Sequence, residues 1–136
     1  MASRLIRTKV TSCRILLAED DAASLEMLAA FLKLHGHVVF PAQDGEQAMT
    51  LARTVRLDLV LTDICMPRLN GVELRRQLRL LAATHDIPVL AMTALSLDAW
   101  DEVHQAGFEE ILPKPIDLDE LERLVEAACD PTRRNH

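Results

Sequence analysis

This sequence of 136 residues contains few aromatic residues and carries no net positive charge. Phe, Trp and Tyr make up 3% of it, and tyrosine is absent. So few aromatic side chains argue against a carrier that stacks a flat organic cofactor on them. The net charge of −6 argues against a nucleic-acid-binding surface, because binding to phosphates needs clustered Lys and Arg side chains.

Long apolar runs are also missing. The longest uncharged apolar stretch covers residues 87–97, whereas a membrane-spanning helix needs about 20 such residues. The first residues lack the apolar core of a signal peptide. We therefore expect a cytoplasmic protein that does not contact a membrane.

Cysteine occurs only at Cys13, Cys65 and Cys129. This odd number and wide separation fit reduced thiols better than a disulfide or a zinc site. We therefore expect three free thiols. The histidines form no metal-binding pattern, and we expect them at the surface.

The remaining sequence is that of one globular domain in which strand and helix patterns alternate five times. Such alternation predicts a doubly wound α/β fold, in which a five-stranded parallel sheet carries helices on both faces. We expect a flexible N-terminal lead over residues 1–12, the domain over 13–129 and a C-terminal tail over 130–136. Strands are expected at residues 14–18, 37–40, 57–61, 88–92 and 111–112, and helices at 22–34, after 45, at 72–81, 96–105 and 118–129.

Four of the five expected strands end in chemically reactive residues. Because parallel strands all point the same way, these residues should gather at one edge of the sheet, where ligands of such folds bind. Asp21 is an exception, since its place before a helix favours a role as N-cap. The groups are Glu19, Asp20 and Asp21 after the first strand, Asp63 after the third, Thr93 after the fourth and Lys114 after the fifth.

This set of residue types is suited to phosphoryl transfer. Neighbouring carboxylates repel one another unless a cation joins them, and Mg²⁺ prefers oxygen ligands. An aspartate beside Mg²⁺ can form an aspartyl phosphate. A lysine and a hydroxyl group can then neutralise the oxygens of the phosphoryl group.

The same residues resemble the receiver domains of bacterial two-component response regulators. The resemblance extends over residues 14–128 and depends on a combination of motifs: ILLAEDD, DICMPRLNG, AMTA and LPKP. It implies a flavodoxin-like fold with strand order 2-1-3-4-5.

The resemblance also implies roles for individual residues. Asp63 matches the phosphoacceptor, and it would share Mg²⁺ with Glu19, Asp20 and the backbone carbonyl of Cys65. Thr93 matches the hydroxyl group that turns toward the phosphoryl group, and Lys114 matches the ammonium that pairs with it.

Two further positions are informative in this comparison. The bond between Lys114 and Pro115 matches a peptide bond that is usually cis in the family. Ile111 stands where the family commonly has an aromatic switch residue, and this departure puts the usual aromatic coupling to Thr93 in doubt.

The function implied is a phosphorylation-controlled switch rather than a turnover enzyme, since it would catalyse only its own phosphorylation and dephosphorylation. Its partner would be a histidine kinase or a histidine phosphotransfer protein, and a phosphorylation-dependent homodimer is left open. Two alternatives remain: an Mg²⁺-dependent phosphohydrolase with an aspartate nucleophile, and a receiver module from a hybrid histidine kinase or a larger regulator. A flavodoxin-like FMN carrier is disfavoured, because the first strand ends in acids and aromatics are few.

Overall fold

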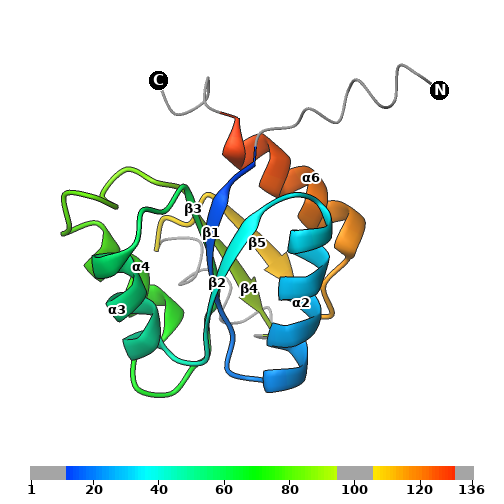
Figure 1. Ribbon diagram of the computed structural model, residues 1–136. Coiled ribbons are helices and arrows are strands. Elements are labelled where there is room, and N and C mark those ends of the chain that lie inside the picture. The colour runs from blue at the N-terminus through cyan, green and yellow to red at the C-terminus, as the bar shows by residue number, and fades with distance from the viewer. Residues whose placement is uncertain (1–11, 95–105, 131–136) are drawn as a thin grey trace.

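The computed structural model describes residues 12–94 and 106–130 of the chain. Its five strands form one parallel sheet in the order β2-β1-β3-β4-β5, which confirms the predicted fold class and strand order (Figure 1). The expected helix at 96–105 lies outside the described residues. The strands are Arg14–Ala18 (β1), Val38–Ala42 (β2), Leu59–Asp63 (β3), Val89–Thr93 (β4) and Glu110–Pro113 (β5). The described helices are Ala22–Leu34 (α2), Gly45–Thr54 (α3), Gly71–Leu78 (α4) and Leu118–Cys129 (α6).

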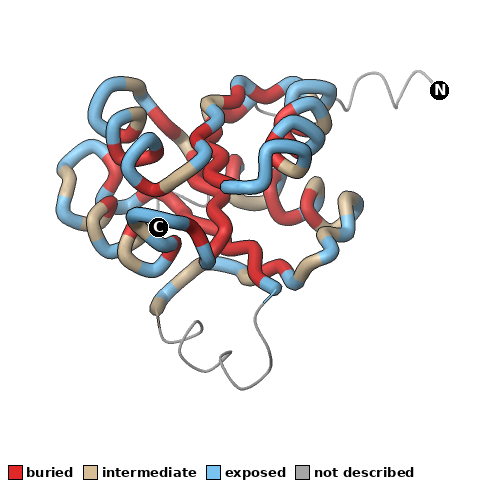
Figure 2. The backbone as a smooth tube through the Cα atoms, turned by 90° about the horizontal axis from the view of Figure 1, so that it is seen from below, coloured by how far each residue is buried: buried red, intermediate tan, exposed pale blue. Residues whose placement is uncertain are grey.

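The sheet lies between two layers of helices (Figure 1). Helices α2 and α6 pack against one face, and α3 and α4 pack against the other. Along β1, Ile15 and Leu17 enter the first of these cores, whereas Leu16 and Ala18 enter the second. Both sides of the strand are therefore buried, which explains why its sequence is a continuous apolar run. Buried backbone, in red, fills the middle of the molecule (Figure 2).

The helices begin at residues whose side chains accept backbone hydrogen bonds. Asp44, Asn70 and Asp117 each accept an N–H from the first turn of the helix that follows. Such caps contribute about 1 kcal/mol each and determine where each helix starts. None of the helices in the described parts of the chain is long and apolar enough to span a membrane.

The prediction of three free thiols is wrong, because Cys13 and Cys129 form a disulfide. They lie 116 residues apart in sequence, but their Cα atoms are 5.9 Å apart, within the range of ordinary disulfides. Cys13 directly precedes strand β1, and α6 runs back along the sheet and ends beside the start of that strand (Figure 1). Sequence separation therefore concealed a proximity that the topology creates. Cys65 is a free cysteine and is exposed.

His37 also departs from the prediction, since it is buried with 6% of its surface exposed. Its Nδ1 accepts a hydrogen bond from the backbone N–H of Cys13 at 3.1 Å. Burial lowers the pKa of His37, the charge of His35 lowers it further, and Glu126 opposes both. The neutral ring is therefore the form that suits the folded protein.

We expect the stability of the oxidised protein to fall as the pH drops below the ordinary histidine pKa of about 6.5. The pKa of His37 is lower in the folded chain, so the unfolded chain takes up the proton first. The contribution is complete above that ordinary pKa and is lost as the pH falls through the folded pKa. Urea unfolding between about pH 7.5 and pH 5 measures it.

The matched variants for this test are His37→Asn and His85→Asn. The amide oxygen of Asn can accept the Cys13 N–H but does not titrate, so His37→Asn should flatten the pH profile. His85 is exposed, and its replacement should leave the profile unchanged. Parallel profiles for the wild type and His37→Asn would contradict the assignment.

Candidate active site at the carboxyl edge of the sheet

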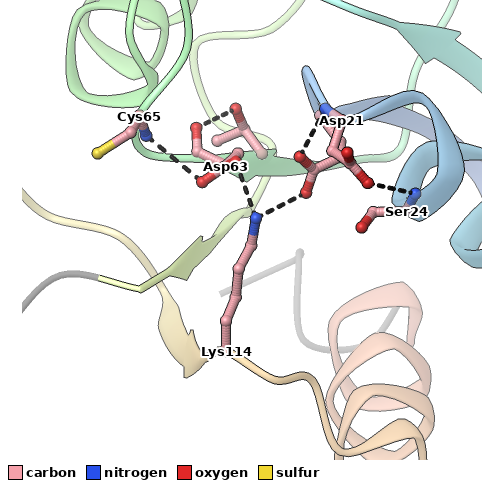
Figure 3. A network of polar contacts seen from close by, with 7 residues as sticks. Asp21, Ser24, Asp63, Cys65 and Lys114 are labelled. Atoms are coloured by element: carbon pink, nitrogen blue, oxygen red, sulfur yellow. Dashed lines mark hydrogen bonds and ion pairs between the residues drawn. The ribbon is translucent and has the colours of Figure 1, made fainter.

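Three charged side chains from different strand ends meet at the carboxyl edge of the sheet. The Lys114 Nζ donates to Glu19 Oε1 and to Asp63 Oδ2, at 2.9 Å in each case (Figure 3). Glu19 follows β1, Asp63 ends β3 and Lys114 follows β5. Parallel register therefore joins residues that lie 95 and 51 positions apart in sequence.

The two carboxylates are buried, and this makes the lysine necessary. Glu19 is 0% and Asp63 is 5% exposed. Carboxylates removed from water in this way need partners that replace its hydrogen bonds. Burial alone would lower the pKa of Lys114, but the hydrogen bonds and charges of Glu19 and Asp63 raise it above its ordinary value. Lys114 therefore remains an ammonium ion at neutral pH.

The acidic residues also form a potential metal site. Oxygen atoms of Glu19, Asp20 and Asp63 all lie within 4.8 Å of one another. A donor set made only of oxygen atoms fits Mg²⁺, which often uses one or two carboxylates and several waters. Both Glu19 oxygens already have protein partners, since Oε1 accepts from Lys114 and Oε2 from the Asp21 N–H at 3.0 Å. Asp20 is exposed, whereas Asp63 is buried and also bonds Lys114.

Asp21 is the N-cap of α2, as the sequence predicted. Its side chain accepts the Ser24 N–H at 2.9 Å (Figure 3). The hydrogen bonds from Ser24 lower the pKa of Asp21. This carboxylate is thus committed to the helix start, whereas Asp20 and Glu19 face the site.

The loop after β3 holds Asp63 in position. The Cys65 N–H donates to Asp63 Oδ1 at 3.4 Å, and the Cys65 thiol points away from Lys114 (Figure 3). The Ile64 N–H donates to the Met92 carbonyl at 2.9 Å, and the Gly71 N–H donates to the Ile64 carbonyl at 2.8 Å. The backbone after the carboxylate is therefore tied both to β4 and to the start of α4.

Two glycines allow this loop to pack closely. A Cβ at Gly71 would lie 2.4 Å from the Asp63 carbonyl oxygen, and one at Gly45 would lie 2.1 Å from that of Leu69. Neither backbone can shift cheaply. No motif in the sequence marks Gly45 as a residue that supports the site, because its close contact with Leu69 arises from tertiary packing.

We expect Gly71→Ala to lower the free energy of unfolding by about 3 kcal/mol, because the new methyl group overlaps backbone atoms. Gly36→Ala is the matched control. Its φ is +92° with nothing within 4 Å, so it should cost only about 1 kcal/mol of left-handed strain. Denaturant unfolding of the two variants measures the difference. Equal losses would mean that the close approach at Gly71 is unimportant.

Thr93 and Lys114 are neighbours across the edge of the sheet. The Lys114 N–H donates to the Thr93 carbonyl at 2.8 Å, and Thr93 is 2% exposed. The Lys114–Pro115 peptide bond is cis, as the resemblance implies. Ile111, which stands where the family commonly has an aromatic switch residue, is half-buried and packs against Ile64 and Ala91.

Comparison with known proteins identifies the same family that the sequence motifs resemble. The family model of the response regulator receiver domain matches residues 15–126. Protein PilH of Pseudomonas aeruginosa is 38% identical over 116 residues, which cover 84% of this chain and 95% of PilH. Response regulator MprA of Mycolicibacterium vanbaalenii is 42% identical over 109 residues, which cover 79% of this chain and 46% of MprA. The chain thus spans about half the length of MprA.

Solved structures agree with this result. The receiver domain of the sensor histidine kinase PA1611 from Pseudomonas aeruginosa, with a magnesium ion coordinated in its active site cleft, is 32% identical. It superposes with a TM-score of 0.81, covering 88% of this chain and 98% of that domain. Fold, motifs and relatives together place this chain in the response regulator receiver domain family of two-component signalling.

Proposed function

We propose that Asp63 accepts a phosphoryl group from a phosphohistidine donor, in a reaction that requires Mg²⁺, and that this modification switches the binding of a partner. The observation that carries the proposal is the position of the Asp63 carboxylate. It is buried, it bonds the Lys114 ammonium at 2.9 Å, and it adjoins the oxygens of Glu19 and Asp20.

The reaction uses the chain's own groups in defined roles. An Asp63 carboxylate oxygen attacks the phosphorus atom, and the P–N bond to the donor imidazole breaks as the P–O bond forms. The imidazole leaves with the bonding electron pair and takes up a proton. Lys114 pairs with the oxygens of the transferred group, and the Thr93 hydroxyl donates to one of them.

The metal would be held by Asp20, Asp63 and the Cys65 carbonyl. Glu19, whose oxygens bond Lys114 and the Asp21 N–H, would lie beside them and add negative charge to the site. When bound, Mg²⁺ would neutralise charge on the phosphoryl oxygens. Support for this comes from the oxygen-only acidic cluster and from the magnesium-containing receiver domain to which the chain is similar.

The partner would be a histidine kinase or a histidine phosphotransfer protein, and the domain would act in the cytoplasm. It would catalyse only its own phosphorylation and dephosphorylation. Both a free-standing domain and a domain of a longer protein have relatives, since PilH is matched over almost its whole length and MprA over less than half.

Intact mass after incubation with acetyl phosphate and Mg²⁺ tests the proposal. We expect one added phosphoryl group, with none when EDTA removes the metal. A phosphohistidine-loaded phosphotransfer protein should label the same site. Absence of label from both donors would overturn the proposal.

The alternative of a phosphohydrolase with an aspartate nucleophile gains no support from the site. Such an enzyme needs a general acid near the nucleophile, and the residue two positions after Asp63 is Cys65, whose thiol points away (Figure 3). We therefore expect no turnover of p-nitrophenyl phosphate.

A further inference from the structure

The Cys13–Cys129 disulfide lies at the opposite edge of the sheet from Asp63. Cys13 immediately precedes β1, and Cys129 is the last residue of α6. The start of the strand and the end of the helix lie together at the top of Figure 1. The bond therefore joins the two ends of the folded domain.

Two interactions link the residues that flank β1 to the segment that contains α6. Before the helix begins, Lys114 bonds Glu19, which directly follows β1. Where the helix ends, Cys129 bonds Cys13, which directly precedes β1. The first attachment is an ion pair and the second is covalent, so only the second depends on redox conditions.

The fold can accommodate both oxidation states of this pair. Cys13 is 1% and Cys129 is 4% exposed, and both belong to the apolar core between α2, α6 and the sheet. Reduced cysteine behaves as a small hydrophobic residue, so two thiols can stay in this core. The native structure therefore does not need the bond to bury these side chains.

The two cysteines differ in how firmly the rest of the chain holds them. Backbone hydrogen bonds hold Cys13, whose N–H donates to His37 Nδ1 and whose carbonyl accepts from Val38. Cys129 lies in the last turn of α6, where helices fray and no basic residue is present. Opening the disulfide should therefore release the end of α6 and leave β1 in place.

We propose that Cys13–Cys129 is a redox-responsive tether that fixes the end of α6 to β1 and is opened by dithiol reductants. Disulfides in cytoplasmic proteins are typically transient and redox-sensing, which fits a bond in a receiver domain. The tether operates whether or not Asp63 is phosphorylated. Its test is therefore independent of the proposed phosphoryl transfer.

Opening proceeds by thiol–disulfide exchange. Fraying of the last turn exposes Cys129, and a thiolate of the dithiol attacks its Sγ. The S–S bond breaks, and Cys13 leaves as a thiolate that takes up a proton. The second thiol of the reductant then attacks the mixed disulfide, releasing Cys129 and an oxidised cyclic dithiol. Oxidised dithiol reverses both steps.

Thiol counting in the native protein is the first test, with dithiothreitol as the reductant. The reductant is removed before the protein is denatured and alkylated. We then expect label at Cys65 alone in the oxidised protein, and at all three cysteines after reduction of the native protein. Oxidised dithiothreitol should restore the Cys13–Cys129 pair in the monomer. Resistance to reduction until the protein is denatured would mean a permanent structural bond and would overturn the proposal.

Hydrogen exchange tests the tether itself. In the reduced protein we expect amides 127–129 to exchange about tenfold faster, while β1 amides stay protected. Cys129→Ala should show this behaviour without any response to dithiothreitol, whereas Cys65→Ala should respond as the wild type does. Equal exchange in the two states, or complete unfolding on reduction, would overturn the proposal. An Asp63→Asn variant should give the same result as the wild type.

Thermal unfolding provides a third measurement. Closing so long a loop should raise the melting temperature by about 10 °C, and this difference should vanish in Cys129→Ala. Equal melting temperatures for the reduced and the oxidised wild type would show that the bond does not constrain the chain.

Discussion

We expect Asp63→Asn to abolish phosphoryl uptake. The variant should gain no mass from acetyl phosphate and Mg²⁺ under conditions that fully label the wild type. The amide oxygen is a poor nucleophile and cannot form a stable acyl phosphate. The variant should stay folded, because an amide oxygen can still accept a hydrogen bond from Lys114 in place of Asp63 Oδ2. Intact mass and circular dichroism on one preparation provide both measurements.

Asp86→Asn is the matched control for this experiment. Asp86 is exposed and precedes β4, at the opposite edge of the sheet, so this variant should be labelled normally. Labelling that persists in Asp63→Asn would mean that Glu19 or Asp20 accepts the phosphoryl group. Peptide mapping would then locate the acceptor.

Lys114→Met is expected to have the second largest effect, a loss of about 2 kcal/mol in the free energy of unfolding without metal. Removing one partner of a buried ion pair can cost more than this, but the Lys114 side chain is 26% exposed and partly solvated. Glu19 and Asp63 would then lie side by side in the protein interior with no cation between them.

The pH dependence of this loss follows from the raised pKa of Lys114. A raised folded pKa gives a contribution that is complete below the ordinary lysine pKa of about 10.4 and disappears as the pH rises through the folded pKa. The difference between the wild type and Lys114→Met should therefore be constant from about pH 6.5 to pH 8.5. Urea unfolding across that interval measures it.

Magnesium should restore more stability to Lys114→Met than to the wild type, because metal and ammonium neutralise the same carboxylates. Lys33→Met, which replaces an exposed lysine of α2, should change neither the stability nor its response to metal. If Lys114→Met and the wild type have the same free energy of unfolding in the absence of metal, the ion pairs of Lys114 do not stabilise the fold.

Much of the fold was accessible to sequence reasoning because its signals are local. The apolar run of β1, the helical spacing of α2 and the cap at Asp21 each depend on residues a few positions apart. Element boundaries differ from the predictions by a few residues. β2, for example, extends to Ala42 through Pro41, which an edge strand tolerates.

The sequence also predicted where the site lies, but not which of its atoms bond one another. That the strand ends converge follows from a parallel sheet, whatever the strand order. Which atoms bond is a separate matter: Lys114 joins Glu19 and Asp63 at once, and Asp21 occupies the second Glu19 oxygen. Register and side-chain conformation decide these contacts, and neither is encoded in any short stretch of the chain.

Local pattern and motif spacing were thus sufficient for the α/β class, the helix starts and the positions of the reactive residues. Tertiary structure alone decided the Cys13–Cys129 bond and the burial of His37. Both depend on where α6 ends and where β2 begins relative to the start of β1. That proximity is produced by packing the whole sheet, because contacts between residues 24 and 116 positions apart leave no periodic signal in a single sequence.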